Sequence, residues 1–214
     1  VLGAGFVRTL AGGIYGGAGN DSLYGGAGND YMNGGADNDL MYGEDGADTL
    51  IGDTGNDTMF GGEGADVFYG GSGSDTNWMD RGADTAYGGN DNDFMYSGLA
   101  DGVTAFGDNG QDQIATGNGN DFLYGGADYD ILFAGLGNDY AYGGTTGDAI
   151  AGYWGIDNLY GGGGADFFNM IFDVRAGEYD YINDWSIADG DTLYLPTAYS
   201  GFVSFGAFGG GAYA

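Results

Sequence analysis

The chain has 214 residues and a formal net charge of −29, because 32 acidic residues face only three arginines and no lysine. A surface this acidic repels nucleic acids and anionic membranes, so neither is expected as a partner. The sequence contains no histidine and no cysteine, which excludes disulfides and the usual zinc sites and leaves few ways to build a catalytic centre. No apolar run approaches the roughly 20 residues of a membrane-spanning helix.

Residues 1–15 are expected to form an opening coil or linker. The segment from Val7 to Tyr15 keeps the strand phase of the repeats that follow, but Gly12 stands where those repeats have aspartate. The first residues, VLGAGFV, lack the charged and long apolar parts of a signal peptide. Because the chain has no initiator methionine and ends at GGGAYA without a clear stop, we expect it to be a piece of a longer protein.

Residues 16–169 follow a nine-residue frame of 17 units, with one extra residue in the tenth. The frame places aspartate at the sixth position of 16 units. That tenth unit, Ser97 to Phe106, shows Gly102 in the place of the aspartate. Alternate units form a first series: Asp21, Asp39, Asp57, Asp75, Asp93, Asp112, Asp130, Asp148 and Asp166. The remaining units form a second series: Asp30, Asp48, Asp66, Asp84, Asp121, Asp139 and Asp157.

Each unit reads as a tight turn followed by a short strand. The first six positions are rich in Gly, Asn and Asp, which favour turns that need positive φ. The eighth position is mostly apolar, and its neighbours alternate outward and inward as in a strand. Two units then make one flattened coil, and stacked coils set successive strands about 4.8 Å apart. The sequence predicts an all-β parallel β-roll in which the two aspartate series form a column on each edge.

The columns predict a metal, and the ligand chemistry favours calcium. The sites offer only oxygen atoms, from aspartate carboxylates and turn carbonyls, and calcium takes six to eight oxygens in flexible geometry. An ion lodged between two successive turns of one column would join two aspartates and backbone carbonyls. Counting intact gaps in both columns, we expect about thirteen calcium ions. One apolar residue in nine is too little to order each unit, so the array is predicted to be unfolded without metal.

The repeat resembles that of the repeats-in-toxin (RTX) family, GGxGxDxUx, where U is a large apolar residue. The segments GGAGNDSLY (residues 16–24) and GGEGADVFY (residues 61–69) fit this pattern at every position. The resemblance implies a parallel β-roll, calcium in the turns and secretion by bacteria. Its departures are Met79-Asp80 in place of the paired glycines, the tenth unit, and the fourth position of four units, occupied by Asp37, Asp91, Asp128 and Thr146.

Residues 170–214 are expected to cap the roll, because an uncapped last coil would leave an open edge. The pattern Asp180-x-Ile182-x-Asp184-Trp185 and the run from Asp189 to Leu193 resemble the segment that follows the repeats in serralysin-type proteins. That resemblance implies further calcium ligands among Asp184, Asp189 and Asp191, and the alternative is a cap with ordinary surface acids. The last residues, FVSFGAFGGGAYA, suggest another hairpin.

Aromatic residues recur at the ninth, outward-facing position. One face carries Tyr69, Tyr87, Phe106, Tyr124, Tyr142 and Tyr160. The other carries Tyr24, Tyr42, Phe60, Trp78, Tyr96 and Phe133. These ladders either stiffen the sheets or form apolar stripes that contact another copy of the chain or another domain.

The function predicted from the sequence is a calcium-binding structural module of a secreted or cell-surface bacterial protein. No catalysis is expected, since the repeat accounts for nearly every aspartate. The alternatives are an assembly module of a surface layer or adhesin, and the non-catalytic C-terminal part of a secreted hydrolase. Ice binding is disfavoured, because only Thr54-Gly55-Asn56 has the required form in the turns.

Overall fold

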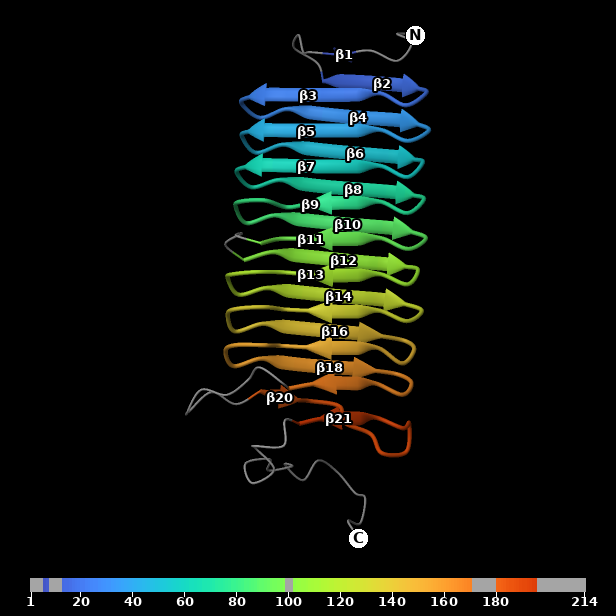
Figure 1. Ribbon diagram of the computed structural model, residues 1–214, viewed down its shortest axis with the longest axis vertical. Coiled ribbons are helices and arrows are strands. Elements are labelled where there is room, and N and C mark those ends of the chain that lie inside the picture. The colour runs from blue at the N-terminus through green and yellow to red at the C-terminus, as the bar shows by residue number, and fades with distance from the viewer. Residues whose placement is uncertain (1–5, 8–12, 99–101, 171–179, 196–214) are drawn as a thin grey trace.

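The chain forms an elongated solenoid of stacked coils, as seen in a computed structural model (Figure 1). The structure describes residues 6–7, 13–98, 102–170 and 180–195. Within these ranges every regular element is a β-strand, and the strands form two parallel sheets. The predicted all-β parallel roll is therefore confirmed.

Successive strands alternate between the two sheets. The odd-numbered sheet consists of β1 (Phe6–Val7), β3 (Ser22–Ala27), β5 (Leu40–Asp45), β7 (Thr58–Glu63), β9 (Thr76–Trp78), β11 (Phe94–Tyr96), β13 (Gln113–Ala115), β15 (Ile131–Phe133), β17 (Ala149–Ala151), β19 (Phe167–Asn169) and β21 (Thr192–Tyr194). The even-numbered sheet consists of β2 (Ile14–Ala18), β4 (Tyr31–Ala36), β6 (Thr49–Thr54), β8 (Val67–Ser72), β10 (Thr85–Asn90), β12 (Thr104–Asn109), β14 (Phe122–Ala127), β16 (Tyr140–Gly144), β18 (Asn158–Gly162) and β20 (Tyr181–Ile182).

One coil contains two repeat units, as the period predicts. Each strand pairs in parallel with the strand two places further along the chain, so that Leu23 lies beside Met41 and Met41 beside Met59. The offset is 18 residues in these pairs and 19 between Thr85 and Thr104. The longer offset absorbs the extra residue of the tenth unit without shifting the sheets out of register.

The core runs along the axis of the roll, where inward side chains from the two sheets pack against one another. The eighth position of each unit points inward, and Leu23, Met32, Phe68 and Leu123 are all fully buried there. Asn77 occupies the same position in β9, also fully buried, and neither its amide nitrogen nor its amide oxygen has a hydrogen-bond partner. The other described strands all place an apolar residue at this eighth position.

The turns tolerate aspartate where the repeat calls for glycine. Asp37, Asp91 and Asp128 stand at the fourth position and have φ values of 73°, 73° and 70°. Glycine enters this left-handed region without strain, and aspartate enters it more readily than most residues. These departures from the repeat pattern therefore preserve the turn.

The outward aromatics stack on one another along both faces. From Tyr69 to Tyr160 on the even-numbered sheet, neighbouring ring centroids lie 4.4–5.1 Å apart with interplanar angles of 3–10°. On the odd-numbered sheet, Tyr24, Tyr42 and Phe60 stack in the same way. Each inner ring is thus sandwiched by its neighbours, which supports stiffening of the sheet as the role of the ladders.

Strands continue both sheets beyond the repeats. At the C-terminal end β20 pairs with β18 and β21 pairs with β19, so the stack extends past Asn169. The likeness of residues 170–214 to a serralysin-type cap stays a prediction, and the hairpin predicted after Pro196 lies outside the described residues, as does Gly12. Within the described ranges, no helix is long and apolar enough to cross a membrane.

Candidate metal sites

The sixth-position aspartates form two columns, one along each edge of the roll. Each aspartate follows a turn and immediately precedes a strand, which places its side chain inside the bend rather than in solvent. Asp30 is half-buried, and every other column aspartate is at most 3% exposed. The first column contains Asp21, Asp39, Asp57, Asp75, Asp93, Asp112, Asp130, Asp148 and Asp166, and the second contains Asp30, Asp48, Asp66, Asp84, Asp121, Asp139 and Asp157.

Hydrogen bonds tie each aspartate to the next one in its column. The backbone N–H of Asp21 donates to Oδ1 of Asp39 at 2.7 Å, and the N–H of Asp39 donates to Oδ1 of Asp57 at 2.7 Å. The same bond recurs along the whole first column from Asp21 to Asp166. In the second column it runs from Asp30 to Asp84 and from Asp121 to Asp157. One carboxylate oxygen of every aspartate that follows another in its column therefore already accepts a hydrogen bond.

The other carboxylate oxygen is left over. Oδ2 is buried without a hydrogen-bond partner in Asp21, Asp39, Asp48, Asp57, Asp66, Asp75, Asp84, Asp93, Asp112, Asp130, Asp139 and Asp148. Leaving a buried charged oxygen without a partner is strongly unfavourable. A row of such atoms, repeated coil after coil, would be stabilised by cations bound beside the carboxylate oxygens.

The first glycine of the repeat has no side chain to fill the space beside these oxygens. We call the space between this glycine, the Oδ2 atom of its unit's aspartate and the carbonyl oxygen one coil ahead the cradle. A Cβ added to Gly16 would lie 2.7 Å from Oδ2 of Asp21 and 2.6 Å from the carbonyl oxygen of Gly34, one coil further on. A Cβ on Gly25 would lie 3.0 Å from Oδ2 of Asp30 and 2.7 Å from the Gly43 carbonyl oxygen. Each cradle thus brings a carboxylate oxygen and a carbonyl oxygen from neighbouring coils to one point.

Burial raises the pKa of many column carboxyls, among them Asp75 and Asp93. Burial, together with the charges of neighbouring aspartates in the column, raises the pKa of Asp75 to about 7 and that of Asp93 to about 8. The hydrogen bond from the preceding aspartate's N–H acts in the opposite direction but is the smaller effect. Without a cation, these carboxyls are neutralised most readily by protons.

The donor set fits calcium. Only oxygen ligands are present, and calcium accepts carboxylates and carbonyls together in irregular geometry. Among the described residues, no three side chains of the acidic, histidine or cysteine type gather around one point. A site here therefore needs backbone carbonyls, such as those of Gly34 and Gly43, beside its carboxylates. That these aspartates are the metal ligands stays a prediction.

The tenth unit differs from its sequence-based alignment. Val103, and not Gly102, occupies the aspartate position, since its N–H donates to Oδ1 of Asp121 at 2.7 Å and Thr104 pairs with Thr85. The extra residue lies earlier in the turn, so counting from Ser97 forward misplaces the position by one. Val103 is 1% exposed, and an apolar side chain thus interrupts the second column.

Both columns continue into the segment after the repeats. Oδ1 of Asp180 accepts a 2.9 Å hydrogen bond from the N–H of Asp157, and Oδ1 of Asp191 accepts a 3.1 Å bond from the N–H of Asp166. Asp184 instead binds the two N–H groups of Gly161 and Gly162. Asp191 is among the ligands predicted from the sequence, but Asp180 is not. The spacing could have identified it, because Asp180-x-Ile182 and Asp191-x-Leu193 repeat the spacing of the sixth and eighth positions.

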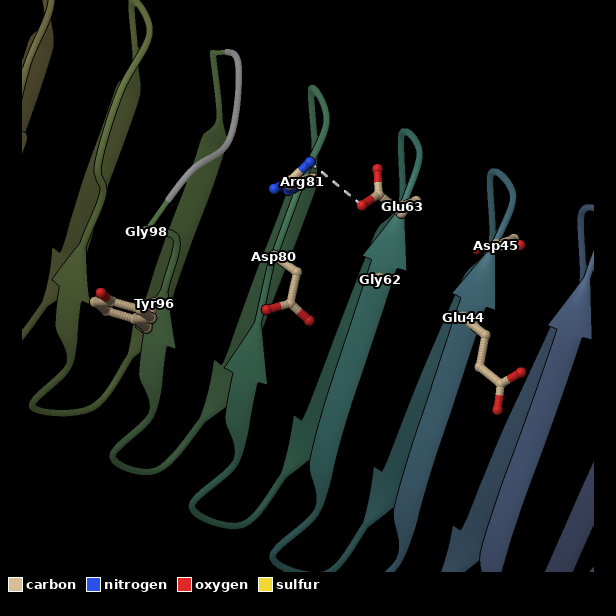
Figure 2. A pocket seen from close by; sticks show the side chains of 8 residues that line it. All are labelled: Glu44, Asp45, Gly62, Glu63, Asp80, Arg81, Tyr96 and Gly98. Atoms are coloured by element: carbon tan, nitrogen blue, oxygen red, sulfur yellow. Dashed lines mark ion pairs between the residues drawn. The ribbon is translucent and has the colours of Figure 1, made fainter.

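A separate acidic hollow lies beside the second column. Its lining includes Glu44, Glu63, Asp80 and Arg81, whose side chains project from neighbouring coils (Figure 2). The Arg81 guanidinium lies 3.6 Å from a carboxylate oxygen of Glu63, and these side chains are 61% and 63% exposed. Because solvent reaches these groups, the hollow requires no metal, and it adds to the negative surface of the roll.

Comparison with known proteins agrees with this geometry. A family profile described as the RTX calcium-binding nonapeptide repeat matches in four copies, at residues 14–41, 42–76, 80–103 and 106–141. A comparison with curated proteins finds no match. The four copies cover more than half of the chain and include most of both columns. The chain belongs to the RTX family of calcium-binding nonapeptide repeats.

Proposed function

We propose that this chain is a calcium-gated structural module of a secreted bacterial protein, unfolded at low calcium and folded outside the cell. The observation that carries the proposal is the row of buried Oδ2 atoms without partners along the roll edges. Proteins with RTX repeats are typically secreted by bacteria, which supports the proposed location. No catalytic role is proposed for the described residues.

The residues of the roll make folding depend on a counter-charge. Stacking the coils buries one carboxyl per unit and brings it close to the next carboxyl of its column. Against this cost, each unit buries only one inward apolar side chain, which stabilises the folded state modestly. Bound Ca²⁺ would supply two positive charges to each gap and accept the Oδ2 and carbonyl oxygens that lack partners.

We expect the folding transition to lie between the low calcium concentration inside the cell and the higher concentration outside it. Calcium modules of extracellular proteins have Kd values of about 10⁻⁴–10⁻³ M. At tenfold excess over Kd, one site stabilises the folded state by roughly 1.4 kcal/mol. Several such sites in each column are enough to move a marginal chain from unfolded to folded when calcium rises to about the millimolar range.

Circular dichroism in calcium-buffered solutions tests the proposal. The chain should give a coil spectrum in excess chelator at pH 7.5 and a β spectrum at 1 mM calcium, with magnesium at the same concentration a poor substitute. Size-exclusion chromatography should show the matching compaction. A β spectrum of equal strength in chelator would contradict calcium gating.

Assembly through the aromatic ladders is the alternative function. The ring faces of Tyr87, Phe106 and Tyr124 are covered by their own neighbours, which favours the stiffening role over contact with another molecule. Light scattering of the calcium-loaded chain separates the two. A monomer over a wide concentration range agrees with stiffening, whereas concentration-dependent growth would support assembly.

A further inference from the structure

The two edges of the roll differ at the first position of the repeat. Beside the first column this position is glycine in every unit from Gly16 to Gly161. Beside the second column, glycine is replaced in four consecutive coils. The replacing residues, all at most 8% exposed, are Met79, Ser97, Thr116 and Ala134. Side chains therefore enter the second edge where the first edge has none.

The structure shows why this position matters for a cation. A Cβ added to Gly52 would lie 2.6 Å from the carbonyl oxygen of Gly70 and even closer to Oδ2 of Asp57. Real Cβ atoms essentially never approach other heavy atoms this closely. A side chain at the first position and an ion between these two oxygens thus compete for the same space.

Thr116 shows what takes the ion's place. Its hydroxyl donates a 2.7 Å hydrogen bond to the carbonyl oxygen of Ala134, one coil further on. In the first column the equivalent carbonyl, such as that of Gly34 beside Gly16, lines the open cradle. The same hydroxyl interacts with the carboxyl of Asp121. A threonine side chain therefore joins two coils at a place where, in the proposed calcium sites, a cation would join them.

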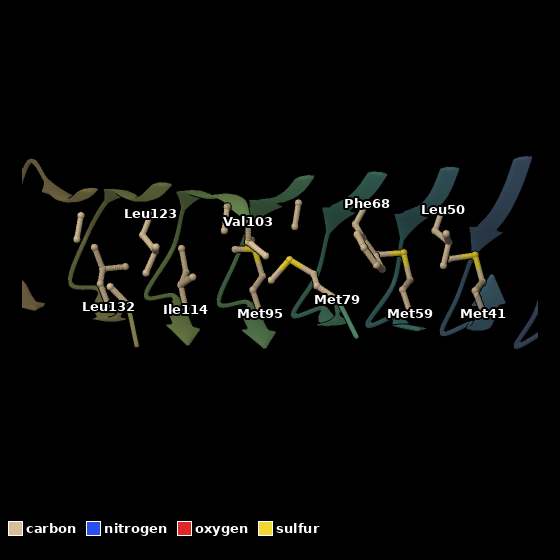
Figure 3. Packing of buried hydrophobic residues seen from close by; sticks show 14 of the residues in the cluster. Met41, Leu50, Met59, Phe68, Met79, Met95, Val103, Ile114, Leu123 and Leu132 are labelled. Carbon is tan, nitrogen blue, oxygen red and sulfur yellow. The ribbon is translucent and has the colours of Figure 1, made fainter. Parts of the chain in front are cut away.

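Met79 closes its own cradle by a different means. It is fully buried and belongs to the core cluster, where Figure 3 shows it among Phe68, Met95 and Val103. The core thus extends outward into the second edge at this coil. Val103, in the aspartate position of the next coil, removes a carboxyl from the same region.

The backbone of the second edge also changes in three of these four coils, whereas Gly135, in the coil of Ala134, keeps a φ of 95°. Second-position residues beside the first column all have positive φ, including Asp53 at 80° and Asp108 at 73°. At Asp80, Gly98 and Gly117, beside the second column, φ is not in this region. The odd-numbered strands also shorten at β9, from six residues in β3, β5 and β7 to three in β9, β11, β13 and β15, and they remain three residues long in β17 and β19.

We infer that the second column has a metal-free centre, from the coil of Met79 to the coil of Ala134, in which buried side chains replace the cations that join the coils elsewhere. This inference rests on the proposed calcium sites of the first column. Asp84 and Asp139, the aspartates of the Met79 and Ala134 units, still have a buried Oδ2 without a partner, so the carboxyls alone do not distinguish the two edges. The first residues of these units, Met79 and Ala134, make the distinction. The roll then binds fewer ions than the repeat count predicts.

Native mass spectrometry of the full calcium-loaded chain tests this, because it resolves successive bound ions. The matched variants are Asp130→Asn, in the first column, and Asp139→Asn, one unit later in the second. Both side chains are fully buried, and both accept the same backbone hydrogen bond. Asp130→Asn should lose one or two ions, and Asp139→Asn should lose none.

Equal losses in the two variants would overturn the metal-free centre. No loss in either would instead contradict the proposed calcium sites, so the two failures are distinguishable. A gain-of-site variant completes the test without removing any carboxyl. Ala134→Gly should open a cradle between Asp139 and the Gly152 carbonyl and gain one ion, whereas an unchanged count would overturn the inference.

Discussion

Oδ1 of Asp75 accepts a 2.7 Å hydrogen bond from the backbone N–H of Asp57, 18 residues earlier, while its Oδ2 is buried without a partner. The same carboxyl thus fastens one turn to the next and presents a free oxygen toward the gap between them. One oxygen of the carboxylate therefore stabilises the stacking of the turns, and the other is available to bind a cation.

Replacing Asp75 by asparagine should weaken the calcium-loaded roll. Asparagine keeps an oxygen for the N–H of Asp57 but removes the charge from the two gaps that Asp75 borders. Losing two sites of roughly 1.4 kcal/mol each predicts about 3 kcal/mol of destabilisation at 1 mM calcium. Denaturant unfolding followed by circular dichroism measures the change.

Asp108→Asn is the matched control for that variant. Asp108 is exposed, lies outside the columns and has a φ of 73°, which asparagine tolerates as well as aspartate. Its replacement removes the same charge and should change stability by no more than about 0.5 kcal/mol. If the two variants are destabilised equally, the column carboxyl has no special role.

Gly52→Ala should disrupt one cradle. The new Cβ would collide with the Gly70 carbonyl oxygen and with Oδ2 of Asp57, so we expect a loss of about 2 kcal/mol or more at 1 mM calcium. Gly163→Ala is the control, because its Cβ would meet no atom closer than 3.3 Å and its φ is not positive. Thermal unfolding should show a clear decrease in Tm for the first variant only.

The metal-free chain should be more structured in acid than at neutral pH. Burial raises the pKa of Asp75 to about 7 and those of Asp93 and Asp139 to about 8, so the folded state binds protons more tightly than the unfolded state. The resulting stabilisation is complete below about pH 4 and is lost as pH rises through about 7–8. Circular dichroism in metal-free buffer between pH 4 and 9 measures this.

The same protons compete with calcium. At pH 8.5 more column carboxyls are ionised than at pH 6, so the calcium midpoint of folding should fall as pH rises across this range. A metal-free chain that gains β structure on going from pH 5 to pH 8 would have the opposite sign and would refute the assignment of the raised pKa values to the folded state.

The period of the sequence was sufficient to predict most of the fold. Glycine pairs and the Asp-x-apolar spacing predicted the 18-residue coil, and the pairing of Leu23 with Met41 confirms it. The period could not place the extra residue of the tenth unit, because a turn can absorb an insertion anywhere before the strand. The register of Thr104 against Thr85 was needed to put Val103, rather than Gly102, in the aspartate position.

The sequence also could not show the role of the first glycine at each site. The repeat pattern treats Met79 or Ala134 as a mismatch of uncertain effect. Three-dimensional contacts show that the position borders Oδ2 of its own unit's aspartate and the carbonyl one coil ahead. Asp180 was overlooked for a related reason, because the nine-residue count stops at Asn169 while the sheets continue through β20 and β21.

Asn77→Leu should stabilise the roll. Asn77 lies in the core between Met59 and Met95, and both of its amide polar atoms are buried without partners. Replacing it with an apolar side chain of similar size removes that desolvation penalty, for an expected gain of about 1–3 kcal/mol. Unfolding at fixed 1 mM calcium tests this, with Met95→Leu as a neutral core control, and a loss of stability would show that Asn77 has a polar role.

Anomalous diffraction from crystals of the calcium-loaded chain would locate the ions themselves. We expect a row of anomalous peaks along the first column, each beside an Oδ2 atom and the carbonyl of the first glycine one coil ahead, as at Asp57 and Gly70. The same coils with no peaks along this edge, and with the Oδ2 atoms still buried and unpartnered, would contradict it.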